Sequence, residues 1–267
     1  MRESRFQLAD GDRNVGTLYL PDERHEPLPA LIVCHGWPGD RRLYPFTEEL
    51  CARATDAGLA VVTFDFYSSG DTGGDPGGMS DGRWAANLAA VRAYVAGQEW
   101  ADARRIGSLG ISSGSTAVLR CAIETGTLAV GISVATCLGH YIGMPNGPAK
   151  RLIDNFDALL AGGTVELYGY PCGLDYFKDF IGGAPIYRLH KVTCPVFFLQ
   201  GGADNVFRRT DARLGYEMMQ GRGLSADYRE IAGGDHGLAN VAHEATTAVL
   251  DWLRRVAFLR QIEGDGA

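Results

Sequence analysis

Five short apolar runs, none of which alternates with polar residues, constrain the fold of this chain most. They are residues 31–34, 59–64, 106–109, 128–134 and 196–199. Strands of a parallel sheet have this pattern, because helices cover both faces of such a sheet and bury every side chain. Between the runs, Trp84, Leu88, Val91 and Val95 recur at the spacing of one helix face. The alternation predicts an α/β fold: a mostly parallel central sheet of about eight strands with helices on both faces.

Further elements extend this pattern at both ends of the chain. Residues 5–9 and 15–20 predict an antiparallel hairpin around Asp10-Gly-Asp12, and residues 227–231 predict the last strand. Two more apolar stripes have helical spacing: Leu43, Phe46, Leu50 and Ala54, and later Val241, Ala245, Ala248, Trp252, Val256 and Leu259. A chain of 267 residues buries enough surface for a full core without disulfide support.

The charge balance excludes several classes of partner. With 25 Lys+Arg against 32 Asp+Glu, the net charge is −7, whereas nucleic acids and anionic membranes require clustered basic residues. No apolar run approaches the roughly 20 residues that span a bilayer, and the opening MRESRF lacks the apolar core of a signal peptide. We therefore expect a cytoplasmic protein that acts on a small molecule and binds neither nucleic acid nor membrane. The sequence leaves open whether the chain forms a homodimer.

The six cysteines are scattered and form no C-x-x-C pair. They are Cys34, Cys51, Cys121, Cys137, Cys172 and Cys194. Several lie in apolar stretches, which is typical of reduced, buried thiols in a cytosolic protein. The alternative is one or two disulfides in an exported chain whose signal has been removed.

One long stretch interrupts the alternation of strands and helices. Residues 137–191 are rich in Gly, Pro and aromatic residues, with weak helical signals at 149–160 and 176–180. A connection this long in a compact domain is usually functional. We expect a lid here, inserted into a core made of residues 1–136 and 192–267. The alternative is extra packing over the edge of the sheet.

The segment Gly110-Ile-Ser112-Ser113-Gly114 carries the strongest chemical signal. It follows the apolar run 106–109 and precedes a helical stretch, which is the context of a G-x-S-x-G nucleophile elbow. A serine on such a sharp turn has strained backbone angles, and the flanking glycines let strand and helix approach each other. Ser112 is the predicted nucleophile. The alternative is an ordinary Gly/Ser-rich turn.

A serine hydroxyl needs a base, and the base needs a carboxylate that orients it. Of six histidines, His236 lies in a loop just after the expected last strand, where α/β sheets place reactive groups. Asp204 follows the run 196–199 in a similar loop. Asp235 is the rival, but as the neighbour of His236 it cannot easily reach the far ring nitrogen. We expect the triad Ser112, Asp204 and His236.

Two backbone N–H groups are needed where charge develops on the substrate oxygen. The run 31–34 ends in His35-Gly-Trp37-Pro38-Gly39, where Trp37 N–H is the natural donor because Pro38 has none. Ser113 N–H, which follows the nucleophile, is the second. His35 is expected to fix this loop, and Asp65 and Gly70 to stabilise the loop beside it.

Candidate substrate contacts come from these loops and from the aromatic segment. They are His35, Tyr67, His140, Tyr141, Tyr170 and Phe177. The sequence contains no G-x-G-x-x-G, Walker A or H-E-x-x-H motif, and no Cys/His cluster with zinc spacing. No cofactor and no metal site is therefore expected.

With these motifs together, the chain resembles an α/β-hydrolase over nearly its whole length. The residues that carry the resemblance are HGWPG at 35–39, FDFYSSGD at 64–71, GISSG at 110–114, GGAD at 201–204 and GDHG at 234–237. Within that superfamily the chain is most similar to dienelactone-hydrolase-like and feruloyl or cinnamoyl esterase-like proteins. The resemblance implies a Ser-Asp-His triad and a lid after the sixth core strand. Dienelactone hydrolases proper use a cysteine nucleophile, whereas this elbow has Ser112.

The sequence therefore predicts a serine hydrolase that cleaves a carboxylic ester through an acyl-enzyme, with a small, aromatic or apolar substrate. A thioesterase or an acyltransferase is the alternative, because it would use the same nucleophile, base, carboxylate and oxyanion donors. A small peptidase and a non-catalytic ligand-binding protein are further alternatives, the latter disfavoured because every triad residue is present.

Overall fold

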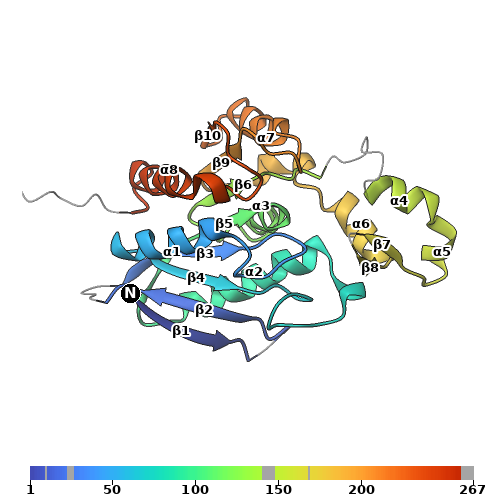
Figure 1. Cartoon of the computed structure of the whole chain (residues 1–267), viewed down its shortest axis with the longest axis horizontal. Coiled ribbons are helices and arrows are strands. Elements are labelled where there is room, and N and C mark those ends of the chain that lie inside the picture. The colour runs from blue at the N-terminus through green and yellow to red at the C-terminus, as the bar shows by residue number, and fades with distance from the viewer. Residues whose placement is uncertain (10, 23–26, 140–147, 168, 260–267) are drawn as a thin grey trace, which may run out of the picture.

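An eight-stranded sheet forms the centre of the computed structural model, which describes residues 1–9, 11–22, 27–139, 148–167 and 169–259. The strands are β1 (Arg2–Gln7), β2 (Val15–Leu20), β3 (Leu28–Cys34), β4 (Ala60–Phe64), β5 (Ala101–Ile111), β6 (Gly131–Val134), β9 (Val196–Gly201) and β10 (Ala226–Ile231). Their order is β1-β2-β4-β3-β5-β6-β9-β10. β2 pairs antiparallel with β1 and β4, and all other neighbours are parallel (Figure 1). The predicted α/β class and mostly parallel sheet are confirmed.

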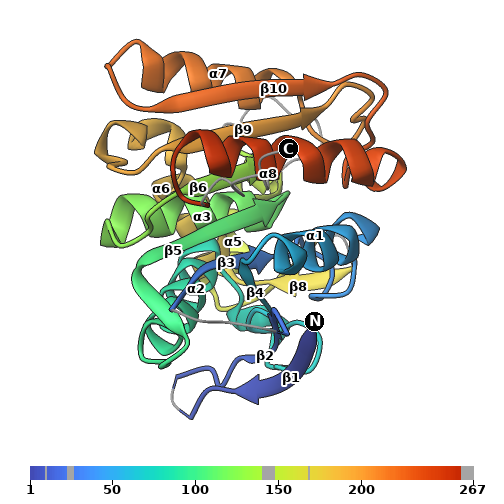
Figure 2. The same ribbon diagram turned by 90° about the vertical axis from the view of Figure 1, so that its left-hand side faces the viewer.

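Helices cover both faces of this sheet. One face carries α1 (Pro45–Asp56) and α8 (Ala242–Arg255), and the other carries α2 (Asp81–Ala96), α3 (Ser113–Thr125) and α7 (Thr210–Gln220) (Figure 2). β3 and β4 are buried at every residue, as their unbroken apolar runs predict.

The helical spacings identify the buried residues of the helices with three exceptions: Leu43, Val241 and Val256. Val241 and Val256 lie just outside α8 and are only partly buried. Trp84, Leu88, Val91 and Val95 are all buried on α2. Leu43 was expected on the apolar stripe of α1, but its side chain is 42% exposed. The helix begins only at Pro45, whose fixed φ suits the first turn, so Leu43 lies in the preceding loop.

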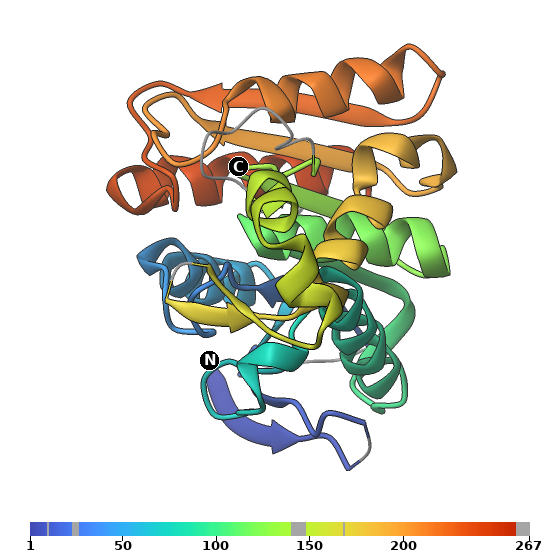
Figure 3. The same cartoon turned by 90° about the vertical axis from the view of Figure 1, so that its right-hand side faces the viewer.

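The chain between β6 and β9 forms small elements outside the sheet. They are α4 (Pro148–Asp154), α5 (Phe156–Leu160), the hairpin β7 (Val165–Leu167) and β8 (Tyr170–Cys172), α6 (Leu174–Gly182), and the 3-10 turns η3 (Pro185–Tyr187) and η4 (Leu189–Lys191). The helices and the hairpin lie across one end of the strands (Figures 1 and 3). The parallel strands point toward that end, so these elements face the loops that follow β3, β5 and β9.

All six cysteines are buried and none of them forms a disulfide bond, as expected from their apolar surroundings. Burial raises the pKa of the Cys51 thiol to about 12 and those of Cys121, Cys172 and Cys194 to about 11. These thiols stay protonated at neutral pH. In the described ranges, no helix has both the length and the apolar character needed to cross a bilayer.

Candidate active site

Ser112 occupies a sharp turn between β5 and α3. Its backbone angles are φ 58° and ψ −124°, a conformation that costs a non-glycine residue free energy. A β-carbon on Gly114 would lie 2.4 Å from the carbonyl oxygen of His35, and one on Gly110 would lie 2.1 Å from that of Gly114. The two glycines therefore allow strand and helix to meet at a distance that no side chain permits, and Ser112 is held at the tip of the turn.

The Asp204 carboxylate, which follows β9, is surrounded by hydrogen-bond donors. Oδ1 accepts from the backbone N–H groups of Val206 (2.8 Å) and Phe207 (3.1 Å). Oδ2 accepts from Nε2 of Gln200 (2.9 Å) and lies 2.9 Å from Nδ1 of His236. Because an ionised carboxylate only accepts, Nδ1 of His236 must carry a proton and donate it. This fixes the tautomer in which Nε2 is free to accept a proton.

The electrostatics of Asp204 agree with that assignment. Burial alone would raise its pKa, but the hydrogen bond and charge of His236, with the N–H groups of Val206 and Phe207, hold the pKa below its ordinary value. The side chain is fully buried, so the negative charge is retained without contact with solvent. A stable anion at this position stabilises an imidazolium on His236.

Asp235, the rival carboxylate, is engaged elsewhere. Its Oδ1 accepts from the backbone N–H of Ala239 (2.8 Å), while its own N–H donates to Asn240 (2.9 Å). Asp235 thus stabilises the loop that carries His236, and Asp204 is the carboxylate bonded to the ring.

A cavity of about 290 Å³ brings the expected reactive groups together. Ser112, Ser113, His236 and Trp37 all line it. They come from the loops after β5, β10 and β3, at the carboxyl ends of parallel strands, where such sheets place their sites. The residues expected from the sequence to act as nucleophile, base and oxyanion donors therefore all line one space.

The loop after β3 is fixed by the buried ring of His35. Nδ1 of His35 lies 2.7 Å from the carbonyl oxygen of Gly36, while Nε2 accepts from the backbone N–H of Phe66 (3.1 Å). Nδ1 therefore carries the proton, and burial lowers the pKa of the ring. The next peptide bond, Trp37–Pro38, is cis. This ring links β3 to the loop after β4, and both of its nitrogens are engaged.

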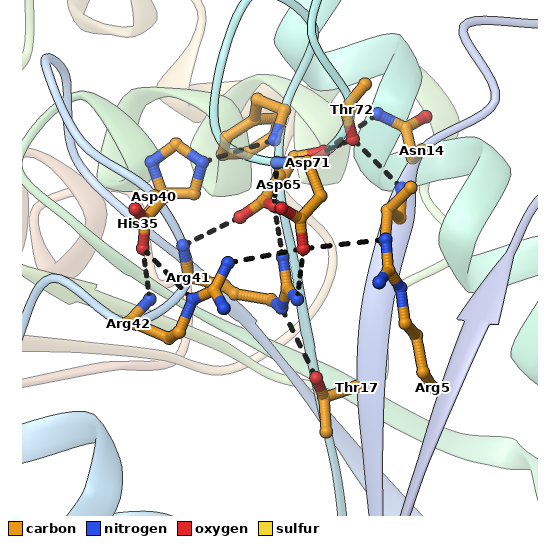
Figure 4. Close-up of polar contacts among 12 residues, drawn as sticks. Arg5, Asn14, Thr17, His35, Asp40, Arg41, Arg42, Asp65, Asp71 and Thr72 are labelled. Carbon is orange, nitrogen blue, oxygen red and sulfur yellow. Dashed lines mark hydrogen bonds and ion pairs between the residues drawn. The ribbon is translucent and has the colours of Figure 1, made fainter.

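Asp65 fastens the same two loops together (Figure 4). Its side chain is fully buried, accepts from the backbone N–H groups of Arg41 and Asp71 (both 2.8 Å), and is ion-paired with the Arg41 guanidinium. Arg41 also donates to Asp71 (2.8 Å). A β-carbon on Gly70 would lie 2.4 Å from the Asp65 carboxylate, so only glycine fits there.

The candidate substrate contacts fall in several places. His35 and Phe177 are buried, and neither belongs to the cavity wall among the described residues. Tyr67 lies under the Arg83 guanidinium (3.3 Å to its ring centre), also away from the wall. Tyr170 is not among the described wall residues either, but its ring contacts that of Trp37 at a tilt, with ring centres 5.4 Å apart. His140 and Tyr141 lie outside the described residues.

The cavity wall also contains residues that were not predicted as site residues from the sequence. They include Tyr44, Asp81, Tyr176, Phe180, Val206 and Phe207. Phe207 packs edge-on against the His236 ring, with centres 5.1 Å apart. Tyr44 precedes α1 outside any motif, whereas Tyr176 and Phe180 belong to the aromatic segment expected near the substrate. No group of His, Cys, Asp or Glu side chains within the described ranges is placed to hold a metal ion.

Comparison with known proteins decides the family. Residues 31–251 match the sequence profile of the Alpha/beta hydrolase family. The chain belongs to the alpha/beta hydrolase family. The match begins in β3 and ends in α8, so it includes the elbow and the loops of Asp204 and His236.

The relatives that this chain matches align with most of its length. An uncharacterised protein of Mycobacterium tuberculosis is 28% identical over 215 residues, which are 78% of this chain and 64% of the relative. Among solved structures, Est1E of Butyrivibrio proteoclasticus with ferulic acid bound has a TM-score of 0.77 at 17% identity, covering 92% of this chain and 96% of Est1E. GrgF of Penicillium sp. sh18 has a TM-score of 0.73 at 15% identity, with 96% and 99% covered. At these identities the solved structures establish the fold alone.

Proposed function

We propose that this hydrolase cleaves carboxylic esters through an acyl-enzyme on Ser112. The observation that carries the proposal is the Asp204–His236 pair, because His236 lines the same cavity as Ser112 and its Nδ1 is held by Asp204. Asp204 enforces the tautomer that a general base requires, and Ser112 is held on a strained turn at the start of α3. The apolar and aromatic wall suits a small aromatic or aliphatic ester.

The reaction follows from these positions. Nε2 of His236 takes the Ser112 proton as Oγ attacks the ester carbonyl carbon, and the backbone N–H groups of Trp37 and Ser113 bind the resulting oxyanion. Collapse of this intermediate breaks the bond to the alkoxy oxygen, which leaves as the alcohol with the proton from His236. Water then attacks the acyl carbon with His236 again as base, releasing the carboxylic acid and restoring Ser112.

We further propose that residues 137–191 act as a lid over this core. Tyr176 and Phe180 reach the cavity wall from α6, opposite the loops that carry the reactive groups. Tyr170 and Tyr176 also contact the Trp37 ring, with centres 5.4 and 6.2 Å away. The segment therefore lies against the Trp37 loop and excludes water from the ester.

A panel of aryl esters and thioesters of graded acyl length tests the function. We expect hydrolysis by the wild type and a loss of kcat of about 1,000-fold or more in Ser112→Ala and His236→Ala. His243→Ala, which removes a histidine 82% exposed on α8, is the matched control and should stay within about twofold. A wild-type rate in Ser112→Ala would reject the proposal. Faster thioester turnover, or transfer to an added alcohol or amine, would favour the thioesterase or acyltransferase.

A further inference from the structure

The wall of the cavity contains a carboxylate that the reaction does not use. Asp81 is the first residue of α2 and lines the same cavity as Ser112. The N-cap role belongs to the preceding Ser80, whose hydroxyl accepts from the Arg83 N–H (3.2 Å). Across the described residues, no hydrogen bond or ion pair reaches the Asp81 carboxylate. A carboxylate withdrawn from bulk water in this way normally has a partner.

Arg120, the cation whose charge acts on Asp81, is already committed to other carboxylates. Arg120 on α3 donates to Asp179 (2.8 Å) and to Glu124 (3.1 Å). Glu124 is shared with Arg188, 3.3 Å away. Asp81, Asp179 and Glu124 therefore contribute three negative charges against two positive ones. The cluster behind the cavity keeps one uncompensated negative charge, carried by the residue that faces the cavity.

The rest of the wall suits a cation. Trp37, Tyr176, Phe180 and Phe207 offer aromatic rings, and the wall contains no Lys or Arg among the described residues. Burial raises the pKa of Asp81 to about 7, with Arg120 opposing the rise and Asp179 adding to it. At mildly alkaline pH the carboxylate is thus ionised, and Arg120, the cation that acts on it, is shared with Asp179 and Glu124. A carboxylate among aromatic rings is a typical recognition site for ammonium groups.

We propose that Asp81 is a specificity-determining residue that binds an ammonium group of the substrate while Ser112 attacks its ester carbonyl. The inference rests on the proposed esterase function and names the substrate class as amine-bearing esters. An ammonium ion would neutralise the excess charge of the cluster and lie against the aromatic rings. A neutral hydroxyl would supply a hydrogen bond but leave that charge in place, so the structure favours the amine.

Paired substrates measure this preference. We would compare p-nitrophenyl esters of ω-aminoalkanoic acids of four to six carbons with esters whose terminal ammonium is replaced by methyl or hydroxyl, at pH 8. In the wild type we expect the amino ester to exceed its methyl partner in kcat/KM, and Asp81→Asn to lower that ratio about 10- to 100-fold. A loss of folded enzyme lowers both rates equally, so the ratio reports recognition alone.

The matched control is Asp175→Asn, which removes a carboxylate 98% exposed on α6 and should leave the ratio unchanged. Two results would overturn the proposal: the same ratio in Asp81→Asn as in the wild type, or a hydroxyl ester preferred to the amino ester at every length.

A binding measurement separates this proposal from the function on which it rests. In Ser112→Ala, calorimetry should show 4-phenylbutylamine binding at least about tenfold more tightly than 4-phenylbutanol, with the preference lost in Ser112→Ala/Asp81→Asn. If esters are not hydrolysed but this preference holds, the esterase function fails and the ammonium site stands. Equal affinity for the two compounds in Ser112→Ala would reject the site.

Discussion

At the scale of single residues, the site depends on how the lone pairs of Asp204 are distributed. One oxygen accepts from two backbone N–H groups, and the other faces Gln200 and His236. The carboxylate thus sets both the position and the tautomer of the ring. An asparagine has nearly the same shape but must place an NH2 group where one oxygen stood.

We predict that Asp204→Asn lowers kcat by about 1,000- to 10,000-fold with little change in KM. The two backbone N–H groups keep the amide oxygen, so the amide NH2 faces His236 and favours the tautomer that cannot accept the Ser112 proton. Steady-state kinetics on an aryl ester measure the loss. Asp235→Asn is the control and should change kcat by less than about tenfold, because Asp235 bonds only to its own loop. Equal losses in the two variants would contradict this assignment.

Ionisation of Asp81 is expected to lower the stability of the folded protein. Burial raises its pKa in the folded protein to about 7, above the ordinary value of an aspartate. The folded protein therefore binds the extra proton, and stability falls as pH rises from about 4 to 7. Asp81→Asn cannot ionise and avoids this loss. The facing charged groups are Arg120 on α3, Asp179 on α6 and His236 across the cavity.

Urea unfolding should therefore show Asp81→Asn about 1–3 kcal/mol more stable than the wild type at pH 8, with the gap closing near pH 4. A gap that stays constant between these two pH values would show that the Asp81 carboxylate already has a compensating partner.

At the scale of elements, the junction of β5 and α3 depends on two glycines. A β-carbon on Gly114 would meet backbone oxygen atoms of β3 and its loop, which cannot rotate away as a side chain can. We predict that Gly114→Ala destabilises the protein by about 2 kcal/mol or more and lowers activity, measured by urea unfolding and ester hydrolysis. Gly182→Ala is the control, since nothing lies within 4 Å of its added β-carbon and alanine suits a helix. A smaller loss in Gly114→Ala than in Gly182→Ala would contradict the close approach.

The connection between the loops after β3 and β4 depends on one buried ion pair. Removing one partner leaves the other charge uncompensated, so Asp65→Asn should lower the free energy of unfolding by about 3–5 kcal/mol. Asp251→Asn, which removes the exposed partner of Arg254, should cost less than about 1 kcal/mol. Chemical denaturation of both variants checks the difference. Similar costs would mean that Asp65 adds nothing beyond a surface pair.

Sequence patterns predict the elements of the core better than its boundaries. The run 196–199 falls within β9, and Trp84 to Val95 mark the buried face of α2, because period and burial are local properties. The residues of the elbow and of the Asp204–His236 pair are also found from sequence, since turn sterics and chain order specify them. Asp81 is not, because its position on the cavity depends on how α2, α3 and α6 pack. The same holds for Tyr44.

At the scale of the whole molecule, the six cysteines report on the integrity of the core. All are buried, five in one core cluster and Cys51 in the other. Burial raises the pKa of Cys51 and Cys121, so these thiols stay protonated at neutral pH. We predict that a thiol reagent such as dithionitrobenzoate modifies them only as fast as the protein opens, with all six reacting together in denaturant. Rapid modification of one thiol in the native protein would show that its part of the core opens separately.

We propose above all that the fold places Ser112, His236 and Asp204 in one reactive site. The most direct measurement is reaction with a fluorophosphonate, followed by peptide mapping by mass spectrometry. We predict one label per chain, on Ser112. Labelling should be absent in Ser112→Ala and much slower in His236→Ala. A folded wild-type protein that hydrolyses esters while the label falls on another residue, or on none, would contradict it.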